Sequence, residues 1–189
     1  MENIAKDILN YLNNEHTKVE RKEGFMGNYY SHLIDTIYIA EDFENSKMPE
    51  GANNMNKKVA ELITVCHECI HSVQNKYLHI LNTIFSNASM VLALICIFIG
   101  IFWISPLWLK IGTCMSLTVS IVVRLRLEVG AVNGSIKLSQ DVVSKDMVED
   151  VSEQDIQESV RYINTHKYLA LLQMVVDKII FLVLVLIIK

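Results

Sequence analysis

The sequence predicts a mostly α-helical integral membrane protein with a small β element and three transmembrane helices. Apolar residues make up 51% of the 189-residue chain and charged residues 20%. The apolar residues gather in three long runs, and a helical segment before the first run carries two histidines four residues apart. A segment near residue 36 alternates as a strand does. We therefore expect a membrane hairpin inserted between a histidine-bearing helix and a later helix.

The composition excludes several classes of function. The net charge is −4 at pH 7, whereas a nucleic-acid-binding protein calls for a basic face. None of the seven glycines belongs to a G-x-G-x-x-G loop that could cradle phosphates. Two cysteines share one helical turn and two lie in apolar runs, unlike the disulfide framework of a small secreted protein. The four are Cys66, Cys69, Cys96 and Cys114.

The first 40 residues are expected to form a helix and then strands. The N-terminus has acidic residues early and no uninterrupted apolar core, so it does not have the features of a signal peptide. Its apolar residues Ile4, Ile8, Leu9 and Leu12 form one stripe of an amphipathic helix. Residues 35–40 alternate with β-branched and aromatic side chains and predict a strand. HTKVERKE, from His16, is a weaker candidate strand.

Residues 55–81 read as an amphipathic helix that carries two overlapping metal patterns, C-x-x-C and H-E-x-x-H. At about 100° per residue, His67 and His71 project from one face with Glu68 beside them. Cys66 and Cys69 instead fall on the apolar stripe. We interpret C-x-x-C as core packing, with a redox or cysteine-ligated zinc role as the alternative. The stripe also contains Val59, Leu62, Ile63, Ile70, Val73 and Tyr77.

The H-E-x-x-H spacing predicts one zinc ion per chain. Histidines at i and i+4 can bind one zinc, and Glu68 can act as general base on a zinc-bound water. A third ligand must come from elsewhere, and Glu128 is the best candidate because a two-span hairpin returns the chain to the side of the histidines. Alternatively, Glu128 is an interfacial partner of Arg124 or Arg126. The polar residues of 82–89 are where we expect the chain to bend.

The apolar runs predict the membrane part. Residues 88–104 and 107–123 are two uncharged or nearly uncharged arms of 17 residues each, roughly 26 Å long as helices. A buried hairpin in a soluble protein is the alternative. The third run, 168–189, contains Asp177 and Lys178, so it is either a span with a satisfied pair or a shorter span that begins after the pair.

Basic residues near the ends of the arms orient the chain. Lys76 precedes the first arm, and Arg124 and Arg126 follow the second, which places both flanking segments on the cytoplasmic side of a multi-pass plasma membrane protein. The lipid bilayer is then a partner. The expected domains are a cytoplasmic part (1–83), the hairpin (84–127), the third-ligand helix and cytoplasmic segment (128–167) and the C-terminal span (168–189).

Three further elements are expected. Residues 45–56 form a polar loop that leads into the histidine-bearing helix. A helix runs from Glu128 to about Lys137. Ser152 and Asp155 have the spacing of a capping box, which predicts the start of the last helix, and this helix is expected to run continuously into the third apolar run.

Four segments resemble the YugP-type small membrane zinc metallopeptidases. VCHECIHSVQ is similar to the family's A-H-E-x-G-H-A-x-Q helix, with His67, Glu68, His71 and Gln74 at matching places. RLEVGAVNGSIKL resembles its P-x-E-F-x-A-S segment through Glu128. THKYLALL resembles its L-T-Y-x-A-A helix, and GNYYSHLIDTIYIAED its D-H-Y-D-x-x-x-x-T-L-x-L-S strand region. More distantly, the order of parts is similar to that of the HtpX and CAAX-prenyl membrane proteases.

The resemblance implies a membrane-bound zinc endopeptidase of the gluzincin sort. His67, His71 and Glu128 would hold zinc, and Glu68 would be the general base. The resemblance ranks Tyr168 first for stabilising the oxyanion, ahead of His166 and Tyr162. In zincin folds an edge strand pairs with an extended substrate, and residues Thr36, Ile37, Tyr38 and Ile39 are the candidate for that role. The alternative for this strand is an ordinary core strand.

Three departures from the resemblance bear on this expectation. Ile70 stands where the family has glycine, but it lies on the core face of the helix. Val132 stands where the HtpX-like enzymes have an aspartate, and Asn133 is a candidate substitute in support of the metal ligands. The N-terminal membrane segment typical of the YugP type is not expected here, which leaves three spans at most.

Two other functions compete with the peptidase. One is a non-catalytic membrane protein with a structural metal site or a partner-binding role. The other places the zinc inside the bilayer, as in an intramembrane protease. The sequence disfavours the second because the histidines lie among charged residues, namely Lys57, Lys58, Glu61 and Lys76. The expected substrate is a protein or peptide presented near the cytoplasmic interface.

Overall fold

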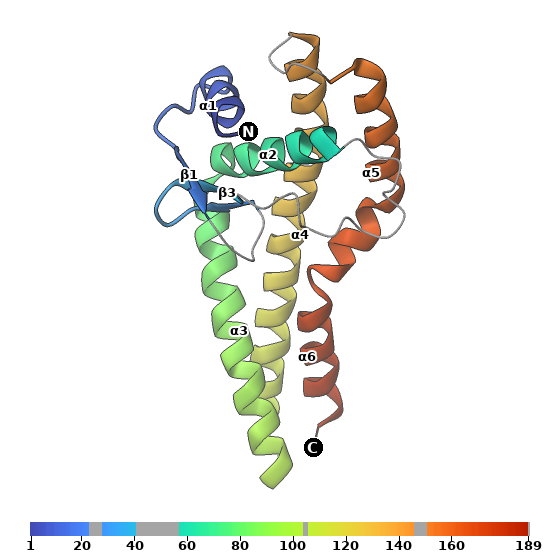
Figure 1. Cartoon of the computed structure of the whole chain (residues 1–189). Coiled ribbons are helices and arrows are strands. Elements are labelled where there is room, and N and C mark those ends of the chain that lie inside the picture. The colour runs from blue at the N-terminus through green and yellow to red at the C-terminus, as the bar shows by residue number, and fades with distance from the viewer. Residues whose placement is uncertain (23–27, 41–56, 104–105, 146–150, 189) are drawn as a thin grey trace. The chain divides into compact units, whose positions relative to one another are not determined.

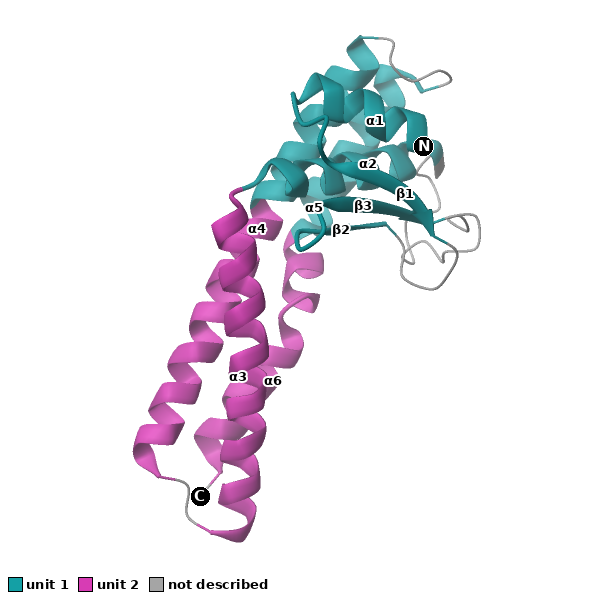
Figure 2. Ribbon diagram, turned by 90° about the vertical axis from the view of Figure 1, so that its left-hand side faces the viewer, with its two compact units in different colours: residues 1–74, 130–167 teal, residues 75–129, 168–189 magenta. Residues whose placement is uncertain are grey.

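The computed structural model of the chain describes residues 1–22, 28–40, 57–103, 106–145 and 151–188 (Figure 1). The chain folds into two compact units, each made of two segments (Figure 2). Unit 1 contains Met1–Gln74 and Gly130–Lys167, and unit 2 contains Asn75–Val129 and Tyr168–Lys189. The predicted polar loop at 45–56 lies outside the described residues.

Unit 1 begins with the predicted amphipathic helix. Helix α1 (Glu2–Tyr11) buries Ala5, Ile8 and Leu9. These side chains join a core cluster with residues from β3, α2 and the C-terminal part of α4. The stripe read from the sequence is therefore confirmed, because residues three and four apart share a helical face.

A three-stranded mixed sheet follows α1, with strand order β1-β3-β2. Strand β1 (Lys18–Lys22) pairs parallel with β3 (Thr36–Ala40), and β2 (Tyr29–Ser31) pairs antiparallel with β3. The central strand is thus β3, with Thr36, Ile37 and Ile39 buried. Both edges of β3 are paired, one with β1 and the other with β2. The strand therefore lacks the open edge that β-addition of a substrate needs. The predicted substrate-binding role of Thr36, Ile37, Tyr38 and Ile39 is not supported, and β3 is the core strand of the alternative interpretation.

Helix α2 (Lys57–Val73) carries the H-E-x-x-H pattern. Val59, Leu62, Cys66 and Cys69 are fully buried in the core of unit 1, which confirms that C-x-x-C packs in the core. Burial raises the pKa of the Cys66 thiol to about 12 and that of Cys69 well above its usual value. Both sulfurs therefore stay protonated near neutral pH, unlike metal-binding thiolates.

The predicted helix over 55–81 is wrong in its extent. Helix α2 ends at Val73, and α3 (Lys76–Phe102) begins after Asn75, whose side chain accepts the Tyr77 N–H at 2.9 Å. This N-cap starts a new helix. Val73 and Tyr77, expected on the buried stripe, are 44% and 76% exposed.

The expected bend at 82–89 is not found, because these residues continue α3. Polar side chains weaken a helix when they compete for its backbone groups, but here they are accommodated within it. Ser89, for example, donates its hydroxyl to the Ser86 carbonyl without breaking the helix. The break lies instead at residues 74–75, directly after the metal-motif turn.

Helix α4 (Leu107–Ser144) is longer than expected and passes through both units. The sequence predicts an end near Lys137, but Leu138, Val142 and Val143 are buried in the core of unit 1 and extend the helix. Within unit 1, α4 comes close to α2. A Cβ atom at Gly134 would lie 3.0 Å from Cγ2 of Ile70, and one at Gly130 would lie 2.9 Å from Nε2 of Gln74. Glycine on α4 thus accommodates the isoleucine that departs from the family pattern.

The capping box that begins α5 (Glu153–Gln173) is confirmed. The Ser152 hydroxyl accepts the Asp155 N–H at 3.1 Å and donates to Oδ2 of Asp155 at 2.6 Å, and the Ser152 N–H donates to the same oxygen. A continuous last helix is not found. Helix α5 ends at Gln173 and α6 (Val176–Ile187) begins after a two-residue break.

Unit 2 is a set of apolar helices: α3, the first part of α4, and α6. They share a small core of Ala93, Cys96, Leu109, Leu117 and Val185. Their other faces expose large apolar side chains. Among the described helices, α3 alone, and α5 with α6 as a bent pair, are long and apolar enough to cross a membrane. The arm at 107–123 is helical but is not among them, so the third span stays a prediction.

Candidate metal centre

His67, His71 and Glu128 come together as the sequence predicts. One ligand atom of each lies within 4.8 Å of the ligand atoms of the other two. Two imidazoles and a carboxylate are the donor set of many catalytic zinc sites. Within the part of the chain that the structure describes, this is the group of three that could hold a metal ion.

The two histidines project from one face of α2. Their rings meet edge to face with centroids 4.6 Å apart, and the two Nε2 atoms are 3.0 Å apart. Two nitrogens bound to one tetrahedral zinc lie roughly 3.3 Å apart, given Zn–N bonds of about 2.0–2.1 Å. The spacing of i and i+4 on a helix therefore brings these nitrogens close to the separation that zinc requires.

Gln74 orients the second histidine. Nδ1 of His71 is 2.8 Å from Oε1 of Gln74. In the tautomer in which Nδ1–H donates to this oxygen, the lone pair of Nε2 points toward the metal position. Gln74 is held in turn by the chain around it, because its N–H donates to the Ile70 carbonyl and its amide lies against Gly130. Gln74, which stands at a matching place in the resemblance, therefore contacts a candidate ligand, and its role in supporting the metal ligands stays a prediction.

The position of Glu128 is compatible with both interpretations that the sequence left open. It is 5% exposed, and its Oε1 lies 2.9 Å from Nε of Arg124, one turn earlier on α4. It also belongs to the group with the two histidines. A carboxylate has two oxygens and several lone pairs, so an ion pair with arginine is compatible with metal ligation.

The general-base candidate is fixed by a backbone group of the sheet. Glu68 is 8% exposed, and its Oε2 accepts the Tyr30 N–H of β2 at 2.7 Å. Sequence reasoning missed Tyr30, because the group that acts is a main-chain N–H and β2 is only three residues long. The short similarity GNYYSHLIDTIYIAED was the one signal that pointed to this region.

A chain of hydrogen bonds ties β2 back to the metal-bearing helix. The Tyr30 hydroxyl donates to Oδ1 of Asp35 at 2.9 Å, and the Thr17 hydroxyl donates to the same oxygen at 2.8 Å. Asn14 donates to Thr17 and to the hydroxyl of Ser72 on α2. Burial, together with Asp35, raises the pKa of Tyr30 well above its usual value, so its hydroxyl remains a donor.

The remaining predicted residues are exposed, except Tyr162, which is half-buried. Tyr168 is 72% exposed, and Asn133 is exposed as well. His166 stacks on Tyr162 with ring centroids 4.3 Å apart, and its Nδ1 is 2.9 Å from the Tyr162 carbonyl oxygen. The oxyanion role of Tyr168 and the supporting role of Asn133 stay predictions.

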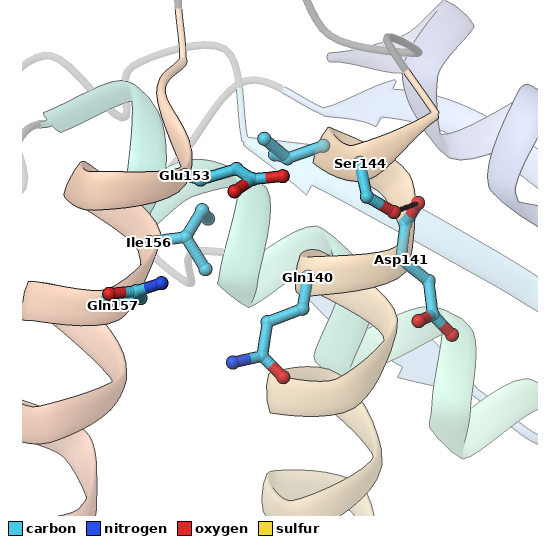
Figure 3. Close-up of a pocket in the computed structure, with 7 residues that line it drawn as sticks. Gln140, Asp141, Ser144, Glu153, Ile156 and Gln157 are labelled. Atoms are coloured by element: carbon cyan, nitrogen blue, oxygen red, sulfur yellow. Dashed lines mark hydrogen bonds between the residues drawn. The ribbon is translucent and has the colours of Figure 1, made fainter.

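Unit 1 also contains a cavity of about 300 Å³ between the end of α4 and the start of α5 (Figure 3). Glu153 points from α5 into the same space as Gln140 from α4, and the Ser144 hydroxyl donates to the Asp141 carbonyl at 2.9 Å. The cavity does not include the metal-ligand group. Its lining is Gln140, Asp141, Val143, Ser144, Glu153, Ile156 and Gln157.

No model of a known protein family matches this chain, and no curated protein or solved structure matches it. The His-His-Glu group is therefore the observation on which a function can be argued. It defines a possible metal site on a mostly α-helical chain with candidate membrane helices.

Proposed function

We propose that this chain is a membrane-bound zinc-dependent endopeptidase. The observation that carries the proposal is the convergence of His67, His71 and Glu128 beside Glu68. The three ligands come from two segments that lie far apart in the sequence, which a chance H-E-x-x-H pattern would not bring together. Zinc bound there would polarise the scissile carbonyl and acidify a water molecule.

The residues around the ligands have definite roles in this proposal. Glu68 takes the proton of the attacking water on its carboxylate and gives it to the leaving amine. The Tyr30 N–H holds one oxygen of Glu68 and so sets the direction of the carboxylate. Gln74 keeps His71 in the tautomer that binds metal. Tyr168 remains the first choice for the oxyanion donor, on the family resemblance of its helix.

The edge strand β2 is a better candidate for binding an extended peptide than β3. It lies at one edge of the sheet, and its Tyr30 N–H points away from β3 toward Glu68. A peptide that added to this edge would run past the general base. The substrate class proposed is a protein or peptide near the cytoplasmic face of the plasma membrane, into which the chain would insert as three spans.

The test compares metal content with cleavage in the purified full-length protein. Wild type should contain one zinc per chain by mass spectrometry and should cleave fluorescently labelled casein in detergent. Glu68→Gln should keep its zinc and lose cleavage by about 10²–10⁴-fold, the usual contribution of a general base. Glu128→Ala should lose zinc. Undiminished cleavage by Glu68→Gln would rule out this mechanism, and full zinc in Glu128→Ala would rule out this ligand.

A non-catalytic metal site is the second candidate. The observation in its favour is that the Glu68 carboxylate is hydrogen-bonded to the sheet, as a structural residue would be. In that case chelation would unfold unit 1, and no cleavage would be detected in the wild type. Circular dichroism with and without EDTA separates the two candidates, since a catalytic zinc can be removed with the fold retained.

A further inference from the structure

Unit 2 contains two buried hydrogen-bond donors, Lys178 and Ser120, that the proposed peptidase does not use. Lys178, near the start of α6, is only 6% exposed, and Ser120 on α4 is fully buried. Arg124 lies one turn after Ser120 on the same face of α4. Buried cations are costly unless they are paired, so Lys178 calls for an explanation.

The register of α4 and α6 brings these residues to one level. Both helices contribute to the apolar core of unit 2, and Lys110 of α4 donates to the Ile188 carbonyl at the C-terminal end of α6. Lys110 and Ile188 therefore lie at one level. Ser120 is ten residues after Lys110 on α4, and Lys178 is ten residues before Ile188 on α6, so equal helical rise brings Ser120 and Lys178 to one level as well. Side chains lean toward the N-terminus of their helix. Arg124 therefore leans toward Ser120, and Lys178 leans toward the turn of Arg124.

The group has an excess of donors. The Ser120 hydroxyl and Nε of Arg124 are buried with no hydrogen-bond partner among the described residues. Nε lies 2.9 Å from Oε1 of Glu128, which is ion-pair distance, but its N–H is not directed at that oxygen. Within the described part of the chain, no carboxylate lies at ion-pair distance from Lys178, and the neighbouring Asp177 is exposed. The buried charge of Lys178 is thus unpaired among the described residues.

We propose that Lys178, Ser120 and Arg124 bind the phosphate of an anionic phospholipid headgroup. A phosphate supplies several strong acceptor oxygens and the negative charge that Lys178 requires. Basic sites between membrane helices bind such headgroups. The surrounding helices expose apolar side chains along which acyl chains would lie, including Val91, Leu94, Phe98, Met115, Ile180 and Val183. The inference rests on the proposed membrane placement of the chain. Arg124 also lies against Glu128, so the test changes Lys178 and Ser120, which do not belong to the group of proposed zinc ligands.

The experiment measures lipid binding to the full-length protein by native mass spectrometry from detergent. Phosphatidylglycerol should bind the wild type in preference to phosphatidylcholine. Lys178→Met should weaken this binding about fivefold, as expected for one cation near a headgroup, and Ser120→Ala should weaken it less. Lys110→Met is the matched control, because it removes a lysine from the other end of the same unit and should leave binding unchanged.

Several outcomes would overturn the proposal. Equal binding by wild type and Lys178→Met, an equal loss in Lys110→Met, or no preference over phosphatidylcholine would each do so. Inorganic phosphate that competes fully at millimolar concentration would assign the site to a free anion instead. Extraction of the wild type from membranes by alkaline carbonate would contradict the membrane placement itself. Zinc content and casein cleavage, measured on the same samples, report separately on the proposed peptidase.

Discussion

At the residue scale, the candidate site depends on a few groups that orient its chemical side chains. Gln74 holds Nδ1 of His71, the Tyr30 N–H holds Glu68, and Arg124 lies against Glu128. A metal ligand whose second polar atom is hydrogen-bonded keeps its orientation and basicity. The helical period predicts which residues share a face, but it does not predict the partner of each. Of these three partners, Gln74 and Arg124 were anticipated and Tyr30 was not.

Replacing Gln74 should weaken metal binding without removing a ligand. Gln74→Leu deletes the acceptor for Nδ1–H of His71, so zinc affinity should fall about 10–100-fold. Competition with a chelator of known affinity measures this change. Gln140→Leu, a glutamine substitution on the exposed part of α4, is the control. Equal zinc affinity in Gln74→Leu and wild type would mean that the His71–Gln74 contact has no orienting role.

At the element scale, close packing of α4 against α2 within unit 1 positions the helix that carries the two histidines. This packing depends on small residues on α4 opposite Ile70 and Gln74. The isoleucine at 70 fills the space that a glycine there would leave open. In this pair the small residue is on α4 and the large one on α2.

Adding a side chain at Gly134 should destabilise unit 1. A Cβ atom there would be 3.0–3.1 Å from three carbons of Ile70, whose side chain packs against the core and has to shift. Overpacking of this kind costs about 1–3 kcal/mol, and the roughly 1 kcal/mol that alanine gains over glycine in a helix offsets part of this cost. Denaturant unfolding measures the change for Gly134→Ala. Ile70→Ala in the same chain should recover part of the loss. Gly112→Ala is the control, since a Cβ at Gly112 would meet nothing within 4 Å and alanine favours a helix.

The capping box of α5 should make stability depend on pH in the acid range. Hydrogen bonds from Ser152 hold the pKa of Asp155 below its usual value of 3.8. The folded pKa is depressed, so this stabilisation is present above pH 3.8 and is lost as pH falls through the folded pKa. Thermal unfolding should show wild type above Asp155→Asn at pH 7, with the two melting temperatures converging as the pH falls through the lowered pKa of Asp155. A constant difference at every pH would contradict the prediction.

At the scale of the whole molecule, the chain divides into a unit that carries the histidines and a unit of apolar helices. Large apolar side chains on the surface of unit 2 favour a membrane environment over water. In the described chain, α3 is long and apolar enough to span a membrane, and so are α5 and α6 if the bent pair counts as one span. The predicted hairpin also requires the arm at 107–123 to cross the membrane.

The hairpin can be tested by labelling from outside the cell. Trp108 lies at the start of α4 and is 73% exposed. If both arms cross the membrane, Trp108→Cys should react with an impermeant maleimide on intact cells. Lys167→Cys, on the side proposed to be cytoplasmic, should react only after permeabilisation. Labelling of Trp108→Cys that also requires permeabilisation would replace the hairpin by a re-entrant or membrane-surface arrangement.

Features that depend on local periodicity and local capping could be predicted from the sequence alone. The amphipathic stripes of α1 and α2, the burial of Cys66 and Cys69, and the capping box at Ser152 all follow from residues a turn or less apart. The choice of Glu128 needed one further assumption, that a hairpin returns the chain to the histidines.

Features that depend on distant pairing emerged only from the folded chain. Folding placed β3 at the centre of the sheet and β2 at its edge, brought the Tyr30 N–H to Glu68, and opposed Gly134 to Ile70. Strand order and helix contact distance are set by which segments bury surface together across the whole chain. A backbone N–H is the same in every residue but proline, so no residue type could have identified the one that holds Glu68.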